Sequence, residues 1–246
     1  MGHSVSREIG LSAGQQGQIA ALLALLEEDE HAPTTIRGRE EAARLHVADS
    51  LSALEIEPVR AAARIADMGS GVGFPGIALA IALPSAQVSL VDSQARRCAF
   101  LERMCAQIAV DNARVVRRRI EEWREGVSRH DVVLARALAA QPVVLEYAAP
   151  LLRVGGTMID WRGRRMPDQE LAADRAAEVL GLQRVEVRRV TPFEGAENHH
   201  LHVFAKVRET PARFPRRAGA ARKRPLGDAS ERGPAGGGKP RPRDQR

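Results

Sequence analysis

One stretch decides the fold of this chain, and it reads Ile65-Ala66-Asp67-Met68-Gly69-Ser70-Gly71-Val72-Gly73-Phe74-Pro75-Gly76. A short apolar run ends in an acid, glycine then occupies every second position, and a proline precedes the Ala/Leu/Ile segment 77–83. This order is typical of a strand, a tight turn and a helix. Because glycine has no side chain, a ligand can lie against the main chain of the turn, facing the free N–H groups of the helix.

The acidic residue before the glycines, Asp67, indicates which class of ligand the turn binds. Residues 71–76 match the G-x-G-x-x-G dinucleotide fingerprint, which is weak evidence alone. The carboxylate of Asp67 would repel a pyrophosphate, whereas S-adenosylmethionine has no phosphate and carries a sulfonium and an ammonium group. We therefore expect Asp67, Gly71 and Gly73 to bind S-adenosylmethionine rather than NAD. The spacing Asp67-x-Gly69-x-Gly71-x-Gly73 resembles motif I of the class I methyltransferases, and a glycine turn that only packs is the alternative.

From residue 65 onward, strand-like runs alternate with helical patterns, which predicts a doubly wound α/β sheet. The expected fold is a Rossmann-like, class I S-adenosylmethionine-dependent methyltransferase with seven strands. Its expected parts are a helical extension at 1–60, the methyltransferase domain at 61–207 and a basic tail without ordered structure at 208–246. After the first strand, further strands are expected at 87–92, 113–118, 130–134, 157–160, 182–190 and 200–207. Helices are expected at 12–30, from near residue 37, and at 95–108, 143–152 and 168–180.

The predicted strands end in polar residues. Asp92 follows Gly71 by 21 positions, close to the roughly 20 residues that separate the glycine turn from the ribose-binding acid of doubly wound sheets. Adenosine is common to NAD and S-adenosylmethionine, so Asp92 supports both ligands. Because sites in open α/β sheets lie at the carboxyl ends of the strands, we expect Asp67, Asp92, Glu121 and Arg136 to converge.

Two polar clusters have two interpretations each, and a third is tested as a metal site. His46, Asp49 and Ser50 lie on one helical face and make either local hydrogen bonds or a functional site. The run 161–165 places arginines beside Trp161, which is typical of a phosphate and base contact surface, or of solvated arginines beyond a strand. His199, His200 and His202 do not have the partners that a metal site requires, so no metal is expected.

Charge is unevenly distributed along the chain. Residues 208–246 hold 12 Lys/Arg against 4 Asp/Glu, a net charge of +8, which leaves 25 against 27, or −2, for residues 1–207. A cationic tail favours a polyanionic partner, although a solubilising terminus is the alternative. No apolar run approaches a membrane span and no secretory signal is present, so we expect a cytoplasmic protein. Cys98 and Cys105 are seven residues apart in one expected helix, which excludes a bridge between them, and we expect both to be buried.

Several segments together resemble the glucose-inhibited division protein B family, the ribosomal RNA small subunit methyltransferase G proteins. They are His46-x-x-Asp49-Ser50, residues 67–76, Val91-Asp92-Ser93 with Arg97, Glu121, Ala135-Arg136-Ala137-Leu138, and the basic segments 214–217 and 223–226. The resemblance implies N7-methylation of a guanine in 16S rRNA, with the small ribosomal subunit or its assembly intermediate as partner and no DNA or membrane partner. It implies cofactor contacts at Gly69, Phe74, Ile120, Glu121 and Arg136.

The chain departs from the family pattern in two places. Residues 32–35 keep only the threonine of the expected Asn-Leu-Thr segment, and Arg162 stands where family members place a lysine after the fifth strand. Both positions are expected to face RNA, and we expect Arg136 and Arg162 to be the catalytic residues. Guanine N7 is a lone-pair nucleophile, so no general base is expected. A small-molecule methyltransferase, an NAD-dependent oxidoreductase and a non-catalytic RNA-binding protein are the alternatives.

Overall fold

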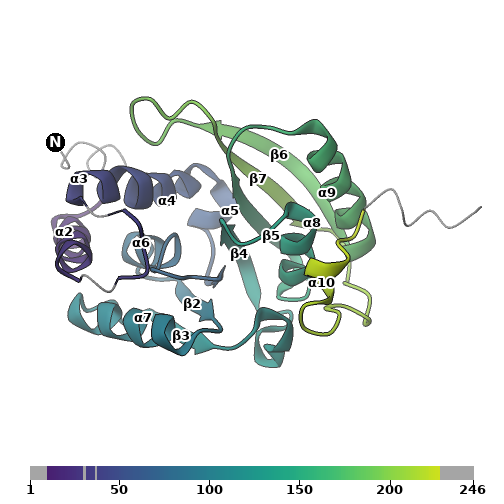
Figure 1. Ribbon diagram of the computed structural model, residues 1–246, viewed down its shortest axis with the longest axis horizontal. Helices are drawn as coiled ribbons and strands as arrows, with labels where there is room; N and C mark the ends of the chain where they lie inside the picture. Colours follow the sequence, from purple (N-terminus) through teal and green to yellow (C-terminus); the bar gives the residue numbers. More distant parts are fainter. Residues whose placement is uncertain (1–9, 30–31, 37, 228–246) are drawn as a thin grey trace, which may run out of the picture.

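The computed structural model describes residues 10–29, 32–36 and 38–227, which form one seven-stranded sheet with helices on both faces (Figure 1). The strand order is β3-β2-β1-β4-β5-β7-β6, in which β7 is antiparallel to its two neighbours. The strands are β1 (Arg64–Met68), β2 (Gln87–Asp92), β3 (Ala113–Arg117), β4 (His130–Arg136), β5 (Leu152–Arg162), β6 (Leu182–Val190) and β7 (His199–Lys206). This order confirms the predicted class I methyltransferase fold.

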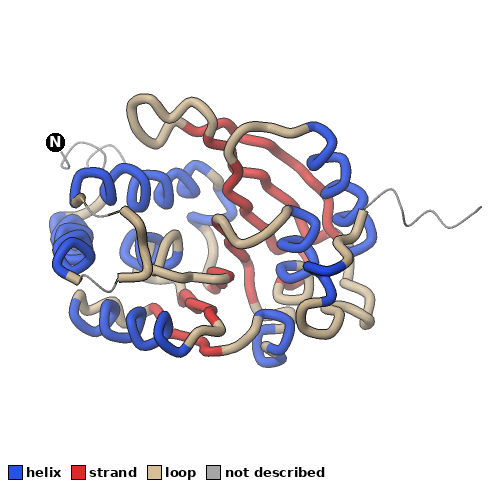
Figure 2. Tube along the Cα trace, in the orientation of Figure 1, coloured by secondary structure: helices blue, strands red, loops and turns tan. Residues whose placement is uncertain are grey.

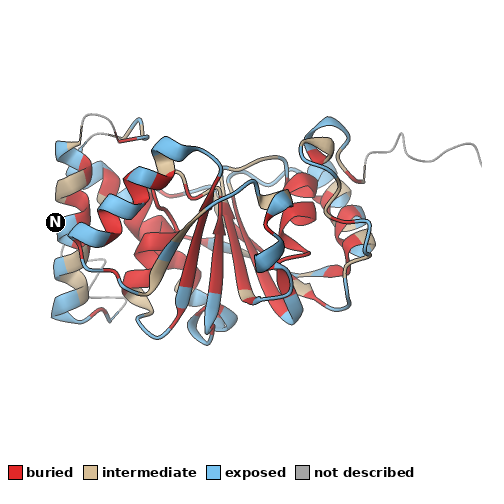
Figure 3. Cartoon of the chain, turned by 90° about the horizontal axis from the view of Figure 1, so that it is seen from below, coloured by how far each residue is buried: buried red, intermediate tan, exposed pale blue. Residues whose placement is uncertain are grey.

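Each sheet face has its own apolar core because successive strand residues point to opposite faces. Alternate residues such as Ile65 and Leu134 pack with the helices α2 (Ala13–Glu28), α6 (Gly76–Ala82) and α7 (Ala95–Gln107). Their neighbours Ala66 and Ala135 pack with α8 (Gln141–Ala148) and α9 (Pro167–Leu180) on the other face. Figure 3 shows the buried strands between the two helical layers, and Figure 2 shows the same division from the view of Figure 1.

The connections reverse direction between β1 and β4. The chain runs outward from β1 through β2 to β3 on one side and from β4 to β5 on the other. Ligands of doubly wound sheets bind at such a switch point, outside the carboxyl ends of the strands. The glycine turn that follows β1 lies at this edge.

The N-terminal extension packs on the α6 and α7 side of the sheet. A capping box of Ser12 and Gln15 begins α2, and Gln15 also donates to the Ile81 carbonyl at the end of α6 (2.8 Å). The next helical segment passes through α3 (Arg39–Ala42), the π-helical turn η1 (Ala43–Ala48), α4 (Asp49–Leu51), the 3-10 turn η2 (Ser52–Glu55) and α5 (Glu57–Arg60). α2 ends at Glu28, before the expected end at residue 30, which lies outside the described residues, as does residue 37, near which the second helix is expected to start. π-turns are often found at functional sites, and this one carries His46.

The structure lengthens two strands relative to the sequence expectation. β4 and β5 continue to Arg136 and Arg162, which are therefore the last residues of strands rather than parts of loops. The segment after β3 forms a 3-10 turn, η3 (Ile120–Glu122). Strand geometry fixes the directions of both arginines, because neighbouring strands set the register of their side chains.

The expectation that the tail has no ordered structure is wrong for residues 208–227. Phe214, Ala221 and Leu226 are buried in the core cluster of α8 and α9, and the short helix α10 (Ala220–Lys223) lies beside α8. The few apolar residues of this segment pack on a surface that the domain already provides. Residues 228–246 of the expected tail lie outside the described residues.

Two further observations bear on the sequence expectations. Cys98 and Cys105 are free and buried, as predicted. Within residues 10–29, 32–36 and 38–227, no helix combines the length and the apolar character that a membrane span requires.

Candidate active site

The glycine turn is pinned to the end of β2. The N–H groups of Gly69 and Ser70 donate to the Val91 carbonyl at 2.8 and 3.1 Å, and the Ser70 hydroxyl donates to the Asp67 carbonyl at 3.0 Å. Gly69 has φ +71°, and a Cβ there would lie 2.6 Å from a methyl of Leu138. A side chain at this position would therefore be strained and would clash.

The next two glycines of the turn are also required by its geometry. Gly71 has φ +56° and its N–H donates to Oδ2 of Asp92 at 3.2 Å. Gly73 has φ +100°, and a Cβ there would lie 2.5 Å from Ile77. The turn thus links β1, β2 and the start of α6.

Asp67 lies beneath the turn and supports it. Its Oδ2 accepts a hydrogen bond from the Gly76 N–H at 3.1 Å, and the side chain is only 1% exposed. Burial raises the pKa of this carboxyl to about 6. A Cβ on Gly76 would lie 2.6 Å from the same oxygen, which explains the glycine at the start of α6. The selection of a cationic ligand by Asp67 stays a prediction, because the contacts of this carboxylate are made within the turn.

Asp92 is held in place with capacity for further hydrogen bonds. Oδ1 accepts from the Gln94 N–H at 2.9 Å, Oδ2 accepts from Gly71, and Arg97 approaches to 3.5 Å. A carboxylate offers about four lone-pair sites. After its two backbone N–H contacts, Asp92 can still accept from the two hydroxyls of a ribose.

A cavity of about 120 Å³ opens at this edge of the sheet. Four of the predicted cofactor residues line it: Gly69, Asp92, Ile120 and Glu121. The other predicted residues, Asp67, Gly71, Gly73, Phe74 and Arg136, are not among its lining residues. Of the four side chains expected to converge, the structure therefore brings Asp92 and Glu121 to one cavity and leaves Asp67 and Arg136 outside it.

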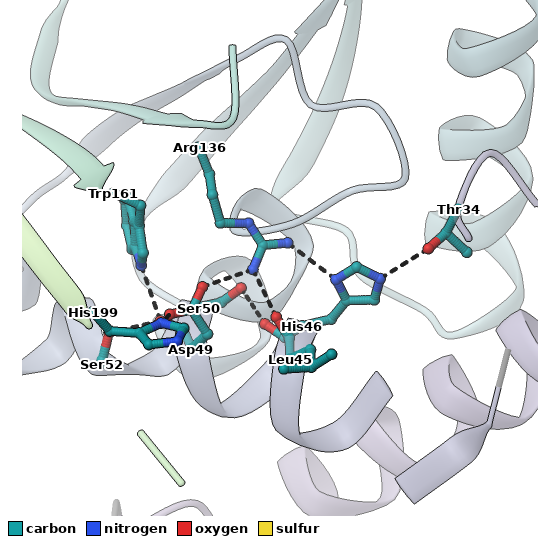
Figure 4. A network of polar contacts seen from close by, with 9 residues as sticks. All are labelled: Thr34, Leu45, His46, Asp49, Ser50, Ser52, Arg136, Trp161 and His199. Carbon is teal, nitrogen blue, oxygen red and sulfur yellow. Dashed lines mark hydrogen bonds and ion pairs between the residues drawn. The ribbon is translucent and has the colours of Figure 1, made fainter. Parts of the chain in front are cut away.

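Arg136 is bound by the N-terminal extension (Figure 4). Its Nη1 donates to Oδ2 of Asp49 at 3.0 Å and to the Leu45 carbonyl at 3.1 Å, and its Nη2 lies 3.2 Å from Nδ1 of His46. The side chain is 16% exposed. In this structure Arg136 thus links β4 to the helical extension, and its expected contact with the cofactor stays a prediction.

The same network fixes the tautomer and the charge of the His46 ring. A guanidinium can only donate, so Nδ1 of His46 is the acceptor and Nε2 carries the proton that is donated to Oγ1 of Thr34 at 3.1 Å. Burial and the charge of Arg136 lower the pKa of His46 to about 4. The neutral ring stacks on Phe74 of the glycine turn, with centroids 4.8 Å apart and planes inclined by 9°. His46 therefore connects Arg136 to the turn.

Asp49 extends the network to the far strands. Its Oδ1 lies 3.0 Å from Nδ1 of His199, and its carbonyl accepts from the Trp161 indole N–H at 3.0 Å. Trp161 is 7% exposed, which contradicts its expected place on an RNA contact surface. The indole packs inward because β4 and β5 pair Arg136 with Trp161, so both side chains face the N-terminal extension.

Arg162 lies on the opposite face of the sheet from Arg136, because it follows Trp161 in the same strand. Its Nε donates to Oδ2 of Asp160 at 2.6 Å and its Nη2 to the Ala139 carbonyl at 2.9 Å. Burial raises the pKa of Asp160 to about 6. The two arginines predicted to be catalytic share an edge of the sheet and do not share a site.

The histidines of β7 make separate contacts. His200 approaches the Gly163 carbonyl at 2.9 Å, and His202 is buried without a hydrogen-bond partner for either ring nitrogen among the described residues. In the part of the chain that the structure describes, no three His, Cys, Asp or Glu side chains are placed to hold a metal ion.

Sequence reasoning missed part of the cavity wall. Tyr147 of α8, Ser93, Arg118 and Arg119 line the cavity, together with Gly219 and Arg222 of the C-terminal segment. The basic motifs at 214–217 and 223–226 were the only signal for this segment, and they indicated a partner rather than a position in the fold.

Comparisons with known proteins point to one family. The model of the GidB family, described as rRNA small subunit methyltransferase G, matches residues 16–200. The chain is 45% identical over 188 residues to the ribosomal RNA small subunit methyltransferase G of Rubrobacter xylanophilus, covering 74% of this chain and 72% of the relative. The protein of the same name from Chloroflexus aggregans is 36% identical over 223 residues, covering 89% of this chain and 93% of the relative.

Solved structures show the same fold at low identity. A S-adenosylmethionine-dependent methyltransferase from Aquifex aeolicus superposes with a TM-score of 0.55 at 14% identity, covering 67% of this chain and 93% of that one. A 16S rRNA (adenine(1408)-N(1))-methyltransferase mutant from Catenulisporales acidiphilia superposes with a TM-score of 0.52 at 18% identity, covering 63% of this chain and 89% of that one.

Proposed function

This chain belongs to the family of rRNA small subunit methyltransferase G proteins, and we propose that it transfers the methyl group of S-adenosylmethionine to N7 of a guanine in 16S rRNA. One observation supports the cofactor most strongly: the cavity at the carboxyl ends of the strands is lined by Gly69 of the turn, by Asp92 and by Glu121. Its polar groups fit a nucleoside, because Asp92 keeps acceptor sites for ribose hydroxyls beside its two backbone N–H contacts.

The cofactor supplies an electrophilic methyl group when it is bound, and the chain supplies its position. Guanine N7 attacks with a lone pair, so no proton has to be removed. His46 agrees with this, because both of its ring nitrogens are engaged by Arg136 and Thr34. Holding the two reactants in line can supply several kcal/mol of rate acceleration.

We assign Arg136 a positioning role. Through His46 it supports the stack on Phe74, which follows the glycines of the turn. Through Asp49 it ties the turn to β5 and β7. The network thereby keeps the cofactor edge of the sheet in one shape without touching the reacting atoms.

The proposed partner is the small ribosomal subunit or its assembly intermediate. Arg117, the last residue of β3, is exposed together with Arg118 and Arg119, and the last two line the cavity. Arg162, at one-quarter exposure, lies at the same edge on the other face. Exposed arginines at the rim of a site suit phosphate contacts that position an RNA substrate.

The test is a methylation assay with separate RNA substrates. Purified protein is incubated with labelled S-adenosylmethionine and with 16S rRNA, 30S subunits or assembly intermediates from a strain that lacks the endogenous enzyme. Nucleoside digestion and mass spectrometry then identify the product. We expect 7-methylguanosine, and methylation of another base or of no RNA substrate would refute the proposal.

A further inference from the structure

The C-terminal segment 211–227 packs on the α8 side of the cavity, and the matched family model ends at residue 200, before this segment. Figure 1 shows α10 beside α8 at the edge of the domain. Phe214, Ala221 and Leu226 are buried in the core cluster of that side. The segment is therefore part of the folded domain.

A buried ion pair anchors the segment. Glu146 of α8 is 1% exposed, and Arg216 contacts both of its oxygens, with Nε 2.9 Å from Oε1 and Nη2 2.5 Å from Oε2. The Arg216 N–H also donates to Oε1 at 3.2 Å, and Nη2 donates to the Arg224 carbonyl at 2.8 Å. A bidentate pair fixes orientation as well as distance, so it sets the path of residues 216–224.

The anchored segment reaches the cavity at two points. The Gly219 N–H donates to Oε1 of Glu121 at 3.0 Å, and Arg222 donates to the Leu138 carbonyl at 3.1 Å. Gly219 and Arg222 line the cavity together with Glu121 and Tyr147. Burial and the neighbouring Glu121 raise the pKa of the Tyr147 phenol.

The position of Asp92 indicates which part of a nucleoside would meet this wall. An acid at the end of the second strand binds the ribose hydroxyls, so the base lies beyond it, toward η3. The lining residues that η3 and the C-terminal segment contribute are Ile120, Glu121, Gly219 and Arg222. The cavity of about 120 Å³ is smaller than the roughly 300 Å³ of a whole ligand pocket, and it suits one end of a nucleoside.

We propose that the C-terminal segment completes the cofactor site and that Arg222 contacts the adenine end of the bound nucleoside. The inference rests on the proposed function, since it requires a S-adenosyl ligand in this cavity. The planar guanidinium of Arg222 keeps N–H groups beyond the one that binds Leu138, and such a group stacks on aromatic faces. Arg216 and Gly219 are positioning residues that hold Arg222 over the cavity.

The test is a calorimetric titration of the full chain with S-adenosylhomocysteine. We compare the unaltered protein with Arg222→Ala and with Lys223→Ala, a matched control that removes the same charge from the next residue, which does not line the cavity. Loss of a hydrogen-bonding contact predicts a dissociation constant raised about three- to tenfold for Arg222→Ala. Lys223→Ala should leave it unchanged.

A second measurement reports on the segment itself. Amide hydrogen exchange of the unaltered protein, followed by mass spectrometry, should slow in residues 219–223 when S-adenosylhomocysteine is added. Equal affinity for both variants and the parent, or equal weakening by both, would overturn the proposal, as would unchanged exchange at these residues. Failure of the unaltered protein to bind S-adenosylhomocysteine would refute the proposed function instead, so the two failures are distinguishable.

Discussion

Replacing Arg136 with alanine should lower the free energy of unfolding rather than act directly on the chemical step. The guanidinium makes hydrogen bonds to Asp49 and to the Leu45 carbonyl, and it supplies the donor that faces Nδ1 of His46. Asp49 is 5% exposed and would keep His199 as its remaining side-chain partner.

The magnitude follows from the burial of the pair. Removing one partner of a buried ion pair costs about 3–5 kcal/mol, and we expect the lower end, about 3 kcal/mol, because Arg136 is partly exposed. In a domain of this size, about 3 kcal/mol corresponds to a fall in melting temperature of roughly 6–12 °C. The loosened stack of His46 on Phe74 should also weaken cofactor binding.

The assay is denaturant unfolding followed by circular dichroism, with Arg153→Ala as the control. Arg153 also forms an ion pair, with Asp131, but its side chain is 52% exposed. An exposed pair contributes only about 0–1 kcal/mol, so this variant should unfold almost like the parent. Equal stability of Arg136→Ala and Arg153→Ala, with methylation lost only in the first, would refute the anchoring role and return Arg136 to direct catalysis.

Three further predictions concern the carboxylate under the turn, the C-terminal anchor and the distal tail. The pKa of Asp67 is raised from 3.8 to about 6, so the folded protein binds this proton more tightly than the unfolded chain, and Asp67 opposes folding at neutral pH. As the pH falls from 7 to 4, protonation of Asp67 should therefore raise the free energy of unfolding of the parent, and Asp67→Asn should not show this increase. Denaturant unfolding at each pH measures the difference, and parallel pH profiles of the two proteins would contradict the raised pKa. Arg216→Ala should lower the unfolding free energy by about 3 kcal/mol, since Glu146 stays buried without its partner, whereas the exposed Arg213→Ala should change it by less than about 1 kcal/mol; thermal melts of both variants decide this. Truncation after residue 227 removes five Lys/Arg and three Asp/Glu, and filter binding should show weaker, less salt-dependent RNA affinity with unchanged S-adenosylhomocysteine affinity; an unaltered salt slope would exclude these residues from RNA contact.

The sequence predicted the parts of the site that depend on backbone pattern. The glycine turn, the strand that ends at Asp92 and the alternation of strands and helices all follow from local periodicity and turn chemistry. Asp92 and Glu121, which this pattern predicted, line one cavity together with Gly69 and Ile120, which the family resemblance implied.

The directions of the arginines could not be predicted in the same way. Arg136 binds residues 87 to 91 positions earlier in the chain, in a helical extension whose place is set by packing. Whether Trp161 or Arg162 faces that extension depends on the register between β4 and β5, which shifts at an irregularity near His130. A strand shifted by one residue would exchange the two faces.

The C-terminal segment shows a second limit. Its composition is poor in apolar residues, which argues against independent order. Phe214 and Leu226 nevertheless pack on an apolar surface of α8 and α9, and Arg216 forms an ion pair with Glu146. Order in such a segment depends on the surface that receives it, which local sequence does not reveal.

The most direct test of the cofactor assignment is a calorimetric comparison of S-adenosylhomocysteine with NADH on the unaltered chain. We expect saturable binding of one S-adenosylhomocysteine per chain and no heat of binding for NADH. Saturable binding of NADH, with no response to S-adenosylhomocysteine, would contradict it.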